Sequence, residues 1–316
     1  MNITFNNNSQ AQKAISKIEF NKSEVIPTDR EDGIYFDMTD KEYFSNKERV
    51  SASQLKKIYL HSEMHLLAKP KKSKQLSLGT YVHEKILEPD KFQEKYAVLP
   101  ENIRNDKRLK AYKEFVEDYP DKEIISHSDY NEVFEIEGNI KKHTKANELL
   151  FNPENKYEVA IYWTDQETGV KCKGKIDILN KEGILDLKTT ADASPEKFAK
   201  AIHNYGYNIS MPFYRMGLAT LTDETPKDSL IPLIFVVTET VSPFCVEVYK
   251  MLEMDIEQSF RLINKLLNDY KKIKETGIYH NYTKKNEIVE LELNSWDKKR
   301  INDWMGYSEY INHEEI

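Results

Sequence analysis

Cysteine is scarce in this sequence, whose 316 residues include only Cys172 and Cys245. Two thiols cannot build a disulfide framework, a four-cysteine zinc site or an iron–sulfur cluster on their own. No apolar run approaches the roughly 18–20 residues of a membrane-spanning helix, and the first residues lack the apolar stretch of a signal peptide. We therefore expect a globular protein of the cytoplasm that makes no contact with membranes.

A basic excess is also missing. The sequence has 46 Lys and Arg residues against 53 Asp and Glu residues, a formal net charge of −7, and its pI is about 5.7. Domains that coat nucleic acid usually have a pI above about 9. The charge balance argues against a protein of that class, but it leaves open an enzyme that holds DNA in one local basic groove beneath an acidic exterior.

The order of hydrophobic patterns predicts one mixed domain. Residues 1–33 are polar and are interpreted as an N-terminal arm, and residues 34–316 as a single domain. Periodicity predicts helices over 51–65, 78–88, 104–119, 131–150, 194–203, 209–221 and 254–276. It predicts strands over 157–163, 170–179, 183–189, 230–240 and 244–251. This order favours an α/β (α+β) fold with a central mixed sheet flanked by helices.

The hairpin at 170–190 carries the most chemistry. Lys171, Lys173, Lys175 and Asp177 alternate with Val170, Cys172, Gly174, Ile176 and Ile178, which we expect on the core face. If residues 180–183 form the loop, Leu179 pairs with Ile184. Asp177 then lies across from Asp186, and Lys175 across from Lys188.

Two ionised carboxylates about 5 Å apart repel by roughly 3 kcal/mol at an effective dielectric of about 20. One Asp can stay protonated, the lysines can neutralise the pair, or a divalent cation can bind between the oxygens. Hard oxygen ligands at this separation suit Mg²⁺ or Mn²⁺. The alternative is an ordinary exposed hairpin with solvated charges.

The hairpin resembles the core of the PD-(D/E)XK nuclease superfamily, with Asp177 as the first acid and Asp186-Leu187-Lys188 as the second motif. The sequence from Gly79 to His83 resembles the G-x-x-x-H motif of the RecB-like branch. A longer set of blocks resembles the nuclease domains of RecE-type exodeoxyribonuclease VIII and its phage relatives: 51–53, 79–89, 171–177, 183–190 and 205–207.

The resemblance implies a restriction-endonuclease-like fold and a Mg²⁺ site, with Mn²⁺ as the alternative ion. Asp177 and Asp186 would be carboxylate ligands, joined by His83 and the backbone carbonyl of Leu187. Taken without the resemblance, a lone helical histidine is more often a packed or surface residue. Lys188 would orient or activate the attacking water and stabilise developing negative charge.

Further residues are expected around this site: Glu158, Lys171, Lys173, Lys175, Ser53, Ser210 and Tyr214. Glu158 is either another acidic ligand or an ordinary strand charge. The three lysines would contact DNA phosphates or neutralise the aspartates. Ser53, near a helix start, would bind a terminal phosphate unless this start serves only as a cap, and Tyr214 contacts DNA or belongs to the core. Relatives usually have Gln where this chain has Ser210.

The expected function is metal-dependent hydrolysis of DNA, as a 5′-to-3′ exonuclease on linear duplex ends in recombination. The resemblance further implies a ring-like homo-oligomer, a single-strand annealing protein as partner, and a bacterial cytoplasm with a phage or prophage origin. Two alternatives stay open, a RecB-like structure-specific endonuclease and a non-catalytic DNA-binding module that keeps the fold.

Overall fold

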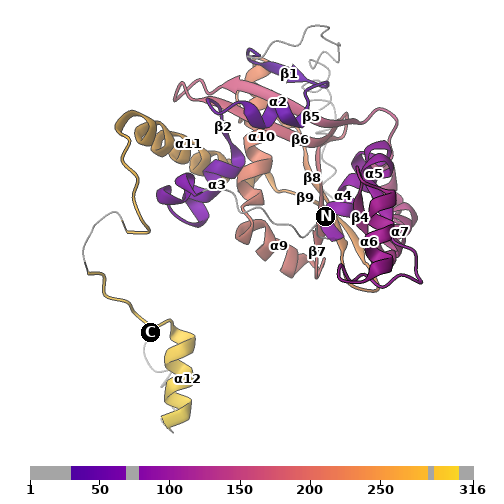
Figure 1. The fold of residues 1–316 in the computed structure, drawn as a ribbon. Coiled ribbons are helices and arrows are strands. Elements are labelled where there is room, and N and C mark those ends of the chain that lie inside the picture. The colour runs from indigo at the N-terminus through magenta and orange to yellow at the C-terminus, as the bar shows by residue number, and fades with distance from the viewer. Residues whose placement is uncertain (1–29, 69–77, 284–287, 306–316) are drawn as a thin grey trace, which may run out of the picture. The chain divides into compact units, whose positions relative to one another are not determined.

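The computed structural model describes residues 30–68, 78–283 and 288–305. The expected arm at 1–33 lies outside the described residues except for its last four positions. The chain divides into two compact units, Met1–Tyr279 and His280–Ile316 (Figure 1). In the second unit, the described residues include the helix α12 (Ser295–Met305). Among the described residues, no helix combines the length and apolar composition needed to cross a membrane.

A mixed sheet forms the centre of the first unit, as the sequence predicts. Its strand order is β1-β5-β6-β7-β8-β9, and the short β2 pairs with β6. The pairs are antiparallel except β7 with β8 and β2 with β6. The strands are β1 (Gly33–Tyr35), β2 (Val50–Ser51), β5 (Lys156–Thr164), β6 (Lys171–Asn180), β7 (Gly183–Thr190), β8 (Leu233–Glu239) and β9 (Val246–Lys250).

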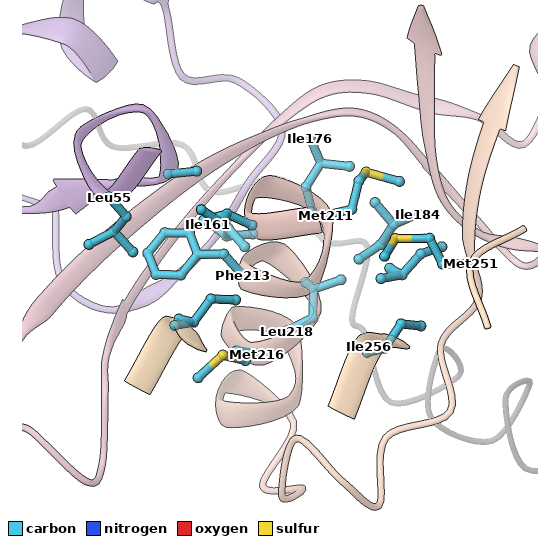
Figure 2. Packing of buried hydrophobic residues seen from close by; sticks show 14 of the residues in the cluster. Leu55, Ile161, Ile176, Ile184, Met211, Phe213, Met216, Leu218, Met251 and Ile256 are labelled. Carbon is cyan, nitrogen blue, oxygen red and sulfur yellow. The ribbon is translucent and has the colours of Figure 1, made fainter. Parts of the chain in front are cut away.

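Helices cover the sheet in two layers, each with its own apolar core. The first core joins the sheet to α3 (Ala52–Leu60), α9 (Pro195–Asn204), α10 (Tyr207–Leu221) and α11 (Glu253–Thr276). Figure 2 shows residues of this core around α10, including Ile161 and Phe213. The second core joins the other face to α4 (Leu78–Leu87), α5 (Pro89–Lys95), α7 (His127–Lys142) and α8 (Thr144–Leu150).

Smaller elements complete the first unit. They are α2 (Asp40–Ser45), the 3₁₀ helix η1 (Glu63–Leu67), β3 (Tyr96–Val98), α6 (Lys110–Asp118) and β4 (Glu123–Ile125). The helix expected over 51–65 ends at Leu60 and resumes as η1. The single helix expected over 131–150 is interrupted at His143, whose Nδ1 accepts a hydrogen bond from the Ala146 N–H at 3.1 Å and so caps α8.

Close packing of α10 on β5 gives a test of this arrangement. A Cβ added at Gly217 would lie 2.8 Å from both Ile161 Cδ1 and Trp163 Cε3. We expect Gly217→Ala to lower the free energy of unfolding by about 1–3 kcal/mol, because overpacking a core has that effect. This loss should appear even though Ala favours a helix over Gly by about 1 kcal/mol.

Gly138 in α7 is the matched control, since an added Cβ there would meet nothing within 4 Å. Gly138→Ala should therefore raise the free energy of unfolding by up to about 1 kcal/mol. Denaturant titration measures both changes. Equal effects of the two substitutions would contradict the close approach of α10 to β5.

Candidate active site

The candidate site lies where β6 and β7 separate. Their ladder contains only Ile178 with Leu185, Leu179 with Ile184, and Asn180 with Gly183. The expected pairing of Leu179 with Ile184 is therefore confirmed. Before Ile178, β6 pairs with β5, and after Leu185, β7 pairs only with β8. The ladder pairs expected between Asp177 and Asp186 and between Lys175 and Lys188 are consequently not formed, because the strands have parted there.

Both β5 and β6 change face beside this fork. Ile176 packs in the first core, whereas Ile178 packs in the second. The expectation that even-numbered residues share one face through Ile178 is thus wrong. The ladder of β5 and β6 skips Glu158 and Asp177, and Glu158 has a φ of 54°. A left-handed backbone at a residue other than Gly is strained and is often found at functional sites.

This irregularity gathers polar groups from four elements. Lys188 of β7 forms an ion pair with Asp186 and places its Nζ 4.0 Å from Asp177 Oδ2. His83 of α4 places its Nε2 3.0 Å from Asp177 Oδ2. One ligand atom each from His83, Glu158 and Asp177 lie within 4.8 Å of one another. The structure therefore brings together five of the expected residues.

Neighbouring charges in this cluster influence one another's ionisation. Burial and the neighbouring Asp177 raise the pKa of Asp186 to about 7. Burial alone would raise the pKa of Asp177 too, but Lys188 and His83 outweigh it and lower that pKa. For Lys188, the two aspartates outweigh burial and raise its pKa. The surroundings thus favour the ionised form of Asp177 and disfavour the ionised form of Asp186. Further positive charge at the site, such as that of a cation, would favour ionisation of both.

The donor set fits a divalent cation. Asp177, Glu158 and His83 offer carboxylate oxygens and an imidazole nitrogen around one point, and burial raises the pKa of Glu158. Carboxylates suit Mg²⁺ and Mn²⁺, while imidazole suits transition metals. Leu187, the expected carbonyl ligand, lies between Asp186 and Lys188 on β7, with its side chain buried in the second core.

Lys173 does not fit the expected contact with DNA. Its side chain is buried beneath α2, where Nζ donates to the carbonyls of Tyr43 at 2.7 Å and Asn46 at 2.6 Å. Burial, with Lys47 and Arg49 nearby, lowers its pKa to about 8. Lys173 therefore anchors the segment around α2 onto the sheet.

This burial gives a pH-dependent contribution to stability. Between about pH 8 and 10.5, the unfolded chain binds more protons at Lys173 than the folded chain does, so stability from this group rises with pH. We expect the unfolding free energy of the native chain, relative to that of Lys173→Met, to rise with pH across that window. Just below the window, the same difference should stay constant. Denaturant titration at several pH values measures it. Lys171→Met, two residues earlier and exposed, should show no such growth, and an identical pH response in both variants would contradict the buried placement.

The other expected DNA contacts differ in exposure. Lys175 forms ion pairs with Asp40 of α2 and with Glu158, so it joins the N-terminal segment to the site. Lys171 is exposed at the start of β6, away from the fork of β6 and β7, and Ser53 is exposed in the first turn of α3.

Ser210 and Tyr214 come from α10. Ser210 is buried. The Tyr214 ring lies against Gly174, where an added Cβ would be 2.7 Å from Tyr214 Cδ1. Burial and the nearby ionisable groups, including Asp186 and Asp177, raise the pKa of Tyr214 well above its usual value. Tyr214 thus borders the site, whereas Ser210 is enclosed in the core.

Two neighbours of Lys188 were not among the expected site residues. The Nζ atoms of Lys188 and Lys56 lie 5.1 Å and 5.8 Å from the centre of the Tyr207 ring. Tyr207 belongs to the block 205–207 that carries the resemblance, and Lys56 lies three residues after the block 51–53. Their shared position could not be predicted, because it depends on how α3 packs against the start of α10.

Comparison with solved structures supports the same fold. A crystal structure from Eubacterium rectale named "Putative exonuclease" matches with a TM-score of 0.55 and 15% sequence identity, covering 83% of this chain and 97% of that chain. A search of curated proteins gave no match. The family model described as "PDDEXK-like domain of unknown function (DUF3799)" matches residues 51–291. With more than half of its length matched, the chain belongs to this PDDEXK-like family, which places it in the PD-(D/E)XK nuclease superfamily.

Proposed function

We propose that this protein is a metal-dependent nuclease that hydrolyses phosphodiester bonds in DNA. The observation that carries the proposal is Lys188, whose ammonium contacts Asp186 and approaches Asp177 at the fork of β6 and β7. Membership of the PDDEXK-like family supports it. Paired carboxylates with an adjacent lysine suit hydrolysis of a phosphate ester, because the reaction needs both a cation site and a group that stabilises new negative charge.

Each side chain has a role in this proposal. Asp177, Glu158 and His83, whose ligand atoms converge, would hold Mg²⁺ or Mn²⁺. Asp186 and the Leu187 carbonyl would be further ligands, as the family resemblance implies. The bound cation would supply Lewis-acid charge that favours attack of water on the phosphodiester.

Lys188 would orient the water and stabilise the charge that develops on the phosphate oxygens. Its position between two carboxylates keeps it protonated, because they raise its pKa. A lysine held in this form acts as a fixed positive charge and donor.

The finer proposal is an exonuclease that acts on the ends of linear duplex DNA with 5′-to-3′ polarity. The name of the Eubacterium rectale neighbour and the RecE-type sequence blocks support this choice. A ring-like oligomer, a role in recombination and a single-strand annealing partner belong to the same proposal. The exposed Lys171 and Ser53 stay proposed phosphate contacts.

Incubation of linear, nicked-circular and closed-circular duplexes with Mg²⁺, Mn²⁺ or EDTA tests the function. Degradation of linear DNA alone, lost in EDTA, is the expected result, and strand-specific end labels then report the polarity. Cleavage of closed circles would instead identify an endonuclease. Binding without cleavage under every cation would identify the non-catalytic module and overturn the proposal.

A further inference from the structure

Lys56 is a second cation beside the candidate active site. It lies on α3, and its Nζ is 5.8 Å from the centre of the Tyr207 ring. Lys188 places its Nζ 5.1 Å from the centre of the same ring. The Tyr207 ring therefore lies close to two ammonium groups, and each of these cations is attracted to the ring quadrupole. Lys56 is thereby positioned next to the site residues without belonging to the metal-binding set.

No carboxylate forms an ion pair with Lys56 within the described parts of the chain, in contrast to Lys175 and Lys188. The side chain is half-buried, and burial and the neighbouring Lys188 lower its pKa by more than the charge of Asp186 raises it. A partly desolvated cation beside a like charge is unfavourable unless an anion compensates it. The position of Lys56 therefore indicates a binding place for an anion that comes from outside the chain.

The backbone at the start of α10 holds the Lys56 side chain in place. Gly206 has a φ of 66°, and a Cβ added there would lie 2.6 Å from Lys56 Cδ and 2.8 Å from Lys56 Cγ. Only Gly gives both the left-handed backbone and the space for the lysine stem. The ammonium is thus directed by contacts along its stem rather than by a salt bridge.

We propose that Lys56 binds a phosphate group of the DNA strand adjacent to the phosphodiester that is cleaved, and thereby positions that strand over the site. The inference rests on the proposed nuclease function, because a nucleic-acid strand carries anionic groups on both sides of the reacting one. Lys56 acts here as a positioning residue, whereas Lys188 faces the reacting group. The pair of lysines on Tyr207 would then contact two successive parts of the backbone.

Binding measurements test this role independently of cleavage. In EDTA, Lys56→Met should bind duplex DNA roughly tenfold more weakly, since a hydrogen bond to a charged group contributes on that order. The slope of log affinity against log salt should fall by about 0.9, the value for one lost phosphate contact on duplex DNA. Lys56→Arg should retain most of the affinity. Lys57→Met, one residue along α3, is the matched control and should keep both affinity and slope.

A modified substrate locates the contact. Replacing a phosphate next to the cleaved bond, on either side in turn, by a neutral methylphosphonate should slow the native chain roughly tenfold at one of the two positions. The same replacement should not slow Lys56→Met any further, because the partner group is already gone. A merely structural lysine would give additive losses instead. Lys56→Gln is a second variant should Lys56→Met not fold.

The outcomes separate this inference from the proposed function. If the native chain cleaves no DNA with any cation, the nuclease proposal fails, while the affinity and salt slope still report on Lys56. If the native chain cleaves DNA and the Lys56 variants keep its affinity, salt slope and response to methylphosphonate, the Lys56 inference alone is overturned.

Discussion

Replacing Asp186 by Asn should reduce DNA cleavage by at least about a hundredfold, the order of loss seen when one preorganised electrostatic group is removed from an active site. Asp186 is buried and forms an ion pair with Lys188, so the substitution removes a proposed carboxylate ligand and the partner of the lysine. Mg²⁺ or Mn²⁺ should also raise the thermal unfolding midpoint of the native chain but have a much smaller effect on Asp186→Asn, because a ligand that binds only the folded state stabilises it.

Asp121→Asn is the matched control for this experiment. Asp121 is exposed and lies between α6 and β4, outside the cluster. The control should keep cleavage and the cation-dependent midpoint. Initial rates on end-labelled linear duplex and thermal scans with and without the cation provide the two measurements. Full cleavage by Asp186→Asn would contradict the placement of the site at the fork of β6 and β7.

Local patterns predicted the hairpin that carries these residues. Leu179 pairs with Ile184 because the polar turn after Leu179 fixes the loop and the apolar alternation fixes the faces. The same locality explains why the helices α9, α10 and α11 were predicted within a few residues of their observed bounds. Their apolar stripes and end signals, such as Gly277 after α11, are contained in the segments themselves.

The sequence patterns could not predict where the side chains of β5 and β6 cease to alternate between the two faces of the sheet. A strict period of two placed Ile178 with Ile176, but the skipped pair Glu158 and Asp177 shifts the phase of both strands. The irregularity depends on two strands at once, so neither segment signals it alone. It also shapes the candidate site, because it is accompanied by the contacts of Asp177 with His83 and Lys188 at the opening of the fork.

Contacts between distant segments were likewise not predictable. Lys173 alternates with Lys171 and Lys175 as a DNA-facing lysine would, yet α2 covers it. A strand face whose sequence pattern indicates exposure can be buried by a segment from elsewhere in the chain, and only the tertiary arrangement decides this. For the same reason, the position of Lys56 beside the site was not predicted. Its neighbours Gly206 and Tyr207 lie in the turn before α10 and at the start of that helix.

Lys188→Met should also reduce cleavage by about a hundredfold or more, but for a different reason from Asp186→Asn. Met preserves much of the stem and removes the charge that lies 4.0 Å from Asp177 Oδ2 and pairs with Asp186. The group that we propose to stabilise negative charge in the reaction is lost, while the carboxylates remain. Removing a competing cation from two acids should leave the Mn²⁺-dependent rise of the thermal midpoint intact or larger.

The contrast between the two variants separates cation binding from chemistry. Lys188→Met is expected to bind the cation without cleaving, whereas Asp186→Asn is expected to lose both properties. Lys181→Met serves as the control. Lys181 belongs to the turn of the same hairpin and, among the described residues, forms an ion pair only with the exposed Glu154. The cleavage rate of this variant should match that of the native chain. If Lys188→Met instead lost the cation response and kept its rate at saturating cation, Lys188 would be an organiser of the carboxylates rather than a participant in hydrolysis. Because the two aspartates repel each other when both are ionised, the lysine and the cation compete to compensate the same charge, and the measured midpoints decide how that charge is shared.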